Sequence, residues 1–81
     1  MIAALLASTK VCVGPKVARR HLTVAKVSGA TKDDVVRIFN DSDTDTMIVG
    51  SGELPLPAEG RMIQVEHKKA SGNPVTVELV R

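Results

Sequence analysis

Hydrophobic residues in this chain alternate with polar ones over short runs, and turn-forming residues separate the runs. The clearest run is "VTVELVR", in which Val75, Val77 and Leu79 share one face. A period of two residues indicates a β-strand with one buried face. Similar runs occupy residues 10–13, 20–27, 34–40, 46–50 and 62–67, and residues 53–56 form a further extended segment broken by proline.

The alternation also predicts which side chains point to the same side of each strand. In residues 34–40, Val36 and Ile38 share one face, and in residues 20–27, Leu22 and Val24 do so. Both faces of the 34–40 run are partly apolar, which is typical of a central or covered strand. The other positions predicted to face inwards are Leu54, Leu56, Ile63 and Val65.

The turns between neighbouring runs are short. Parallel strands need crossovers of a dozen or more residues, so most of these strands must be antiparallel. We therefore predict one all-β domain over residues 1–81, a small antiparallel β-sandwich or β-barrel of six to seven short strands, with residues 1–9 as an apolar N-terminal arm or first strand. An alternative for residues 31–39 is a short helix, capped by Thr31 with Asp34 three residues on.

The composition predicts a thin core. A chain of 81 residues buries only about 60–65 % of its unfolded surface, and Phe39 is the one aromatic residue. Cys12 is the single cysteine, so no disulfide within the chain adds stability. Its valine neighbours favour a small buried apolar role for it. Contacts with further copies or with a larger body are the remaining source of stability.

Charge is unevenly distributed along the chain. All nine acids lie in residues 33–81, whereas the charged residues of segment 1–32 are all basic. The separation is compatible with a nucleic-acid-binding end, with internal pairing of oppositely charged strands, or with head-to-tail attraction between copies. The basic residues of the first segment are Lys10, Lys16, Arg19, Arg20, Lys26 and Lys32.

Three aspartates at every second position, Asp41, Asp43 and Asp45, resemble the start of a calcium loop. An EF-hand loop also needs glycine at position six and glutamate at position twelve, and this run has Thr46 and Gly52 there. Strands rather than helices flank the run. We therefore predict a solvated turn between two strands, with a bound cation as the alternative.

The basic stretch of residues 16–26 is the candidate for nucleic-acid binding. Barrels that bind single strands also stack bases on aromatic side chains, which this chain lacks apart from Phe39. Strand alternation sends Arg19 and Arg20 to opposite faces, so they make a poor single patch. Nucleic acid is therefore not the favoured partner.

No catalytic motif is recognisable. His21 and His67 have no nucleophile or carboxylate at a familiar spacing, and neither makes a zinc set with Cys12. The segment "GSG" at residues 50–52 lacks the lysine and helix of a phosphate-binding loop and is better explained as a turn. The apolar run at residues 1–7 is too short for a membrane span of about 20 residues. We expect no enzymatic activity, cofactor, small-molecule substrate or membrane association.

Residues 35–81 resemble the small β-sandwich accessory proteins of tailed bacteriophage heads, of the decoration, cement or head-fibre-base type. The resemblance rests on a strand ending in Asn40 with Ser42 after it, on "MIVGSG", on the corner "LPLPAEG", and on the last strands "MIQVEH" and "VTVELVR". It implies a virion protein, made in the host cytoplasm, that binds the capsid protein and its own copies, as a trimer at a symmetry axis.

The thin core, the apolar first segment and the separated charges agree with a protein stabilised by copies or by a shell. Two other hypotheses remain: a small nucleic-acid-binding barrel, and a small phage protein that inhibits a host enzyme. The residues predicted to contribute to the contact surface are Ile2, Leu5, Leu6, Arg19 and Arg20.

Overall fold

The computed structural model describes residues 2–42 and 44–81, without the side chains of residues 2–5. Within this described part the chain forms eight β-strands. They are β1 (Ile2–Ser8), β2 (Cys12–Ala18), β3 (Val24–Ser28), β4 (Val35–Asn40), β5 (Asp45–Val49), β6 (Gly52–Pro55), β7 (Met62–Lys69) and β8 (Val75–Val80).

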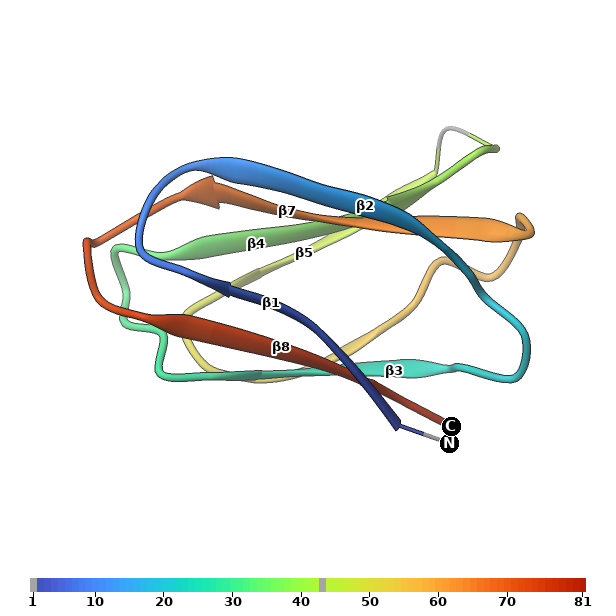
Figure 1. Ribbon diagram of the computed structural model, residues 1–81, viewed down its shortest axis with the longest axis horizontal. Coiled ribbons are helices and arrows are strands. Elements are labelled where there is room, and N and C mark those ends of the chain that lie inside the picture. The colour runs from blue at the N-terminus through green and yellow to red at the C-terminus, as the bar shows by residue number, and fades with distance from the viewer. Residues whose placement is uncertain (1, 43) are drawn as a thin grey trace.

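The strands form two antiparallel sheets of four strands that pack face to face (Figure 1). The first sheet has the order β1-β8-β3-β6, and the second has the order β2-β7-β4-β5. The predicted all-β fold is confirmed, and of its two forms the sandwich is the one present. The predicted six to seven strands were too few, because residues 2–8 pair with β8 as a strand of their own.

The core lies between the sheets and consists of aliphatic side chains from both. The predicted inward positions of β4, β6, β7 and β8 are confirmed, since all are buried. Leu56, which follows β6, is buried with them. The buried apolar residues are Leu22, Ala25, Val27, Val36, Ile38, Leu54, Leu56, Ile63, Val65, Val75, Val77 and Leu79.

The prediction for residues 20–27 was partly wrong. The strand begins only at Val24, because Arg20 has a positive φ of 51° and takes part in a turn before it. The turn changes the alternation. Ala25 and Val27 therefore face the core, whereas Val24 is half-exposed.

Strand β2 continues through Gly14 and Pro15, where the sequence predicted its end. It is an edge strand of the second sheet, and its pairing with β7 shifts register between Val13 and Lys16. Proline is tolerated at a bulged edge because its missing N–H faces no neighbouring strand.

The helix considered for residues 31–39 is absent. Asp34 donates its N–H to the carbonyl of Thr31 at 3.0 Å, and its carboxylate accepts the N–H of Thr31 at 2.9 Å. These bonds resemble a helix cap, but they close a turn, and strand β4 follows directly.

The connections gather at two ends of the sandwich. The β1–β2, β3–β4, β5–β6 and β7–β8 connections lie together at one end, and both chain termini lie at the other (Figure 1). Residues far apart in the sequence thus become neighbours at each end.

Candidate protein-binding surface

The outer face of the second sheet carries exposed apolar side chains on both of its edge strands. Val13 in β2 is 54 % exposed, and Met47 and Val49 in β5 are 51 % and 62 % exposed. Val11, just before β2, is 60 % exposed. Side chains of this size on a small domain are candidates for contact with another protein. We refer to these four residues, with Arg37 and Phe39 between them, as the outer face.

Arg37 lies at the centre of the outer face. It stands beside Met47 of β5 and Glu66 of β7 in the sheet register. Its guanidinium bonds to Asp45 at 2.9 Å and to Glu66 at 3.3 Å, and it lies 4.5 Å from the centre of the Phe39 ring. The hydrogen bond to Asp45, followed by that to Glu66, raises the pKa of Arg37. Ion pairs therefore fix the Arg37 guanidinium in place, between the exposed apolar side chains of β2 and those of β5.

A surface groove adjoins this face among residues of β2, β4 and β7. Its volume is about 380 Å³. The amide of Gln64, one of the lining residues, donates to the carbonyl of Gly14 at 2.9 Å. The groove is lined by Lys16, Phe39, Asn40, Asp41, Met62, Ile63 and Gln64.

The predicted contact residues of the N-terminal segment lie on β1, an edge strand of the first sheet. Leu6 is half-buried and packs against the protein's own core. The side chains of Ile2 and Leu5 lie outside the described part of the structure. A contact role for these three residues stays a prediction.

Arg19 and Arg20 have different surroundings. The guanidinium of Arg19 donates to the carbonyls of Pro57 and Glu59, so it ties the β2–β3 connection to the corner before β7. Arg20 is exposed in the adjoining turn. The structure therefore gives Arg19 an internal role, and the prediction that this pair binds a partner stays untested.

In the described part of the aspartate run, Asp41 and Ser42 form a turn after β4, as predicted. The side-chain carbonyl of Asn40 accepts N–H bonds from Ser42 at 3.0 Å and Thr44 at 3.2 Å, which folds the loop around a buried amide. Asp41 accepts the N–H of Arg61 at 3.1 Å, and Asp45 pairs with Arg37. Asp43 lies outside the described residues. In the rest of the chain, no group of three or more potential metal ligands comes together.

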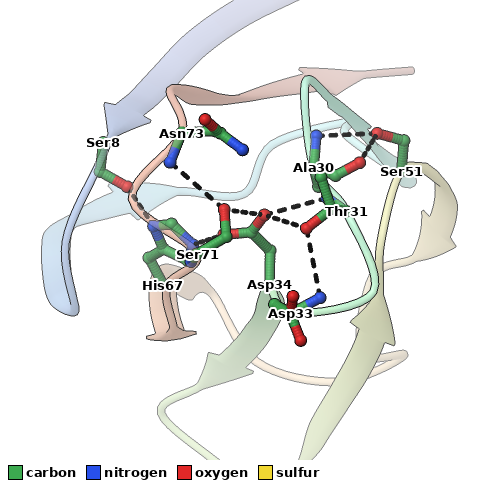
Figure 2. Close-up of polar contacts among 9 residues, drawn as sticks. All are labelled: Ser8, Ala30, Thr31, Asp33, Asp34, Ser51, His67, Ser71 and Asn73. Carbon is green, nitrogen blue, oxygen red and sulfur yellow. Dashed lines mark hydrogen bonds and ion pairs between the residues drawn. The ribbon is translucent and has the colours of Figure 1, made fainter.

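A buried polar cluster joins three segments at the end of the sandwich where four connections meet (Figure 2). His67 of β7 and Asp34 before β4 are both 0 % exposed, and their Nε2 and Oδ1 atoms are 2.9 Å apart. On the other side of the ring, Nδ1 lies 2.5 Å from the hydroxyl of Ser8. With Asp34 ionised, Nε2–H donates to the carboxylate, and the second hydrogen bond of the ring joins Nδ1 to the Ser8 hydroxyl.

Asp34 is satisfied by several further donors. Oδ1 also accepts the N–H of Ser71 at 2.8 Å, and Oδ2 accepts the Ser71 hydroxyl at 2.8 Å. Oδ2 additionally accepts the N–H of Thr31 at 2.9 Å and its hydroxyl at 3.3 Å. The backbone N–H of Ser71, followed by that of Thr31, lowers the pKa of Asp34 far below its usual range, against the opposing effect of burial.

Ser8, His67 and Asp34 are the residue types of a hydrolase triad, but their arrangement suits a structural clamp. In a triad the serine attacks a substrate and the imidazole passes its proton to the leaving group. Here the ring is enclosed, and the Ser8 hydroxyl points inwards onto it (Figure 2). The carboxylate is already saturated with donors. We interpret the cluster as a clamp that fixes three chain segments.

Sequence reasoning did not find this clamp, although one signal was present. His67 has the same parity in its strand as Ile63 and Val65, so alternation places it inwards. That Asp34 is its partner depends on the pairing of β4 with β7, which the sequence does not show.

The other candidate residues have ordinary surroundings. His21 is exposed in a turn. Cys12, predicted to be a small buried apolar residue, is half-buried in β2. The hydroxyl of Ser51 accepts the N–H of Ala30 at 2.9 Å and donates to its carbonyl at 3.0 Å. Gly50 and Ser51 therefore form a turn, as predicted, before β6 begins at Gly52, and the β3–β4 connection holds Ser51 in place.

Comparisons with family models, curated proteins and solved structures find no match for this chain. In the described residues there is no helix of the length and apolarity that a membrane crossing requires.

Proposed function

We propose that this protein is a non-enzymatic structural component of a bacteriophage virion that binds the capsid through protein–protein contacts. The binding role rests on the outer face. Four of its apolar side chains are more than half exposed, and they flank Arg37, which an ion pair with Asp45 fixes in place. Arginine, methionine and aromatic residues are enriched in the centres of protein interfaces. The capsid as the partner is supported by the resemblance of residues 35–81 to head accessory proteins.

The polar chemistry of the molecule supports a binding role over a catalytic one. Its most elaborate polar cluster has a buried centre, Asp34 and His67, and ties chain segments together at one end of the sandwich. The ion pairs of the outer face hold Arg37 in place before any partner arrives, which lowers the entropy lost on binding.

Co-sedimentation with capsid shells tests the proposal. Shells of the particle whose genome encodes the protein are mixed with the purified chain and pelleted. We expect the wild-type protein to pellet with the shells. The Val13→Glu variant should lose at least about tenfold in affinity, because a charge would be desolvated in the contact.

Thr76→Glu is the matched control, since Thr76 is exposed on β8 in the other sheet. It should bind as the wild type does. Absence of the wild-type protein from the pellet would contradict the capsid role, and equal losses for both variants would contradict the outer face as the contact. Binding to nucleic acid or to a soluble host enzyme in place of shells would favour the corresponding rival.

A further inference from the structure

We propose that a second copy of this chain pairs with the exposed edge of β5, so that two second sheets join into one continuous antiparallel sheet. This pairing does not depend on the capsid role. Edge strands normally carry features that prevent such pairing, and the four edges of the described sandwich differ in this respect.

Three of the four edges carry such features. The pairing of β1 shifts register between Ala4 and Leu6, and that of β2 shifts between Val13 and Lys16, with Pro15 in between. Strand β6 has only four residues and ends in proline. In contrast, β5 contains no proline or lysine and pairs with β4 in an unbroken register. It is thus the edge most open to a further strand.

One hydrogen bond shows which backbone groups of β5 face this open edge. Gly50 donates its N–H to the carbonyl of Asp34 at 3.0 Å, so these two residues form a hydrogen-bonded pair. Such pairs alternate along an antiparallel ladder. Thr46 and Ile48 therefore direct their backbone groups to β4, whereas the N–H and C=O groups of Asp45, Met47 and Val49 point to the open edge.

The side chains of β5 are complementary to a second copy of the strand. When two β5 strands run antiparallel about a two-fold axis at Ile48, Met47 lies opposite Val49 of the other copy, and the reverse pair forms by symmetry. Both pairs use outward backbone groups, so each exchanges two hydrogen bonds. The Met47 and Val49 side chains of the two copies then cover one another on the outer face.

The alternative register, centred on Met47, is less favourable. It would place each Asp45 carboxylate directly opposite an apolar Val49. In the register centred on Ile48, Asp45 lies beyond the paired residues, and its bond to Arg37 is undisturbed. We therefore assign the two-fold axis to Ile48.

The pairing is expected to be weak in free solution. β5 has five residues, whereas a standard interface uses about 20–30 residues on each side. The dimer should therefore depend on concentration and be strengthened when copies are held close together. A two-fold axis gives a dimer, unlike the trimer that the phage resemblance implies.

Sedimentation equilibrium over a concentration series tests the proposal. The weight-average mass should rise from the 8.6 kDa of one chain towards twice that value. Met47→Pro should abolish the rise, because it removes an N–H that faces the open edge and leaves the ladder with β4 intact. Val49→Lys should do the same by adding an edge lysine. Val13→Lys is the matched control on the opposite edge and should dimerise normally.

Disulfide trapping tests the register. In a Cys12→Ala background, Ile48→Cys should form a covalent dimer, because Cα atoms of a non-hydrogen-bonded pair lie about 4.5 Å apart, within the range of a disulfide. Thr76→Cys in the same background should stay monomeric. Thermal melting confirms that each variant is folded.

Several results would overturn the proposal. One is a mass of 8.6 kDa up to the highest soluble concentration, with no covalent Ile48→Cys dimer. Another is a wild-type dimer that survives both β5 substitutions, and a third is pairing with added peptide strands but not with a second copy. Trapping through Met47→Cys but not Ile48→Cys would overturn the assigned axis. The capsid test uses Val13 instead of β5, so the two proposals can fail separately.

Discussion

Asp34 and His67 are fully buried polar residues. Substitutions at these two positions test how much the clamp contributes to stability. His67 is one of the largest fully buried side chains, whereas the other histidine, His21, is exposed in a turn. The two histidines therefore provide a direct comparison.

His67→Ala should lower the free energy of unfolding by about 2–5 kcal/mol, the range for truncating a large buried side chain. The substitution also removes the imidazole partner of the Ser8 hydroxyl and one of the donors to the Asp34 carboxylate. His21→Ala should change stability by less than about 0.5 kcal/mol, as surface substitutions do. Urea denaturation measures both, and equal effects would contradict the clamp.

Asp34 should make stability depend on pH in the acid range. Its pKa is lowered in the folded state, so the unfolded chain binds more protons in acid and stability rises with pH. The contribution is complete above the ordinary aspartate range near pH 4 and is lost as the pH falls towards the lower folded value.

Urea midpoints measured between about pH 2 and pH 6 should therefore rise less steeply with pH for Asp34→Asn than for the wild type. Asp33→Asn is the control, because Asp33 is the exposed neighbour. If the urea midpoint of Asp34→Asn rose with pH as steeply as that of the wild type, other carboxylates would be the cause of the acid dependence.

The strands differ in how clearly the sequence predicted them. Strand β8 was predicted correctly because Val75, Val77 and Leu79 alternate strictly with exposed or half-exposed residues. For β1 the sequence predicted either an arm or a strand, because "IAALLAS" is apolar up to Ser8 and has no period. Strand β2 was predicted to stop at Pro15, since only the tertiary position of a strand decides whether proline is tolerated.

The candidate site was harder to predict than the fold. Val13, Met47 and Val49 were not predicted to be exposed, because "KVCV" and "TMIVG" are too apolar for alternation to select a face. The charged centre depends on Arg37 meeting Asp45 and Glu66, which lie on the two neighbouring strands. Sheet order therefore determines the site, and local pattern does not reveal it.

Substitutions at Gly29, in the β3–β4 connection, and at Gly72, in the β7–β8 connection, test how closely these two connections pack. A Cβ on Gly29 would lie 2.5 Å from the carbonyl oxygen of Pro74, whereas one on Gly72 would meet nothing within 4 Å. Both residues have positive φ, 79° and 98°. Backbone strain should therefore affect both alanine variants, whereas the clash with Pro74 should affect only Gly29→Ala.

Gly72→Ala should destabilise by about 1–2 kcal/mol from left-handed strain alone. Gly29→Ala should destabilise by clearly more, because the β3–β4 and β7–β8 connections must move apart. Thermal unfolding of the two variants measures the difference. A Gly72→Ala variant as unstable as Gly29→Ala would contradict the close packing of these connections.

The whole molecule has the surface of a compact single chain. Its accessible surface is 4620 Å², close to the roughly 4700 Å² expected for a folded monomer of this mass. The single chain therefore buries the core between its two sheets, and the expected help from copies or a shell stays a prediction. A partner would bind the outer face and the β5 edge as additional contacts.

Whether the outer face of the second sheet contacts a capsid, as we propose, can be seen directly in an electron cryomicroscopy map of particles carrying the protein. We expect density for the sandwich on the shell, with Val13 and Arg37 turned towards the capsid protein. Density with the first sheet against the shell, or particles without this protein, would contradict it.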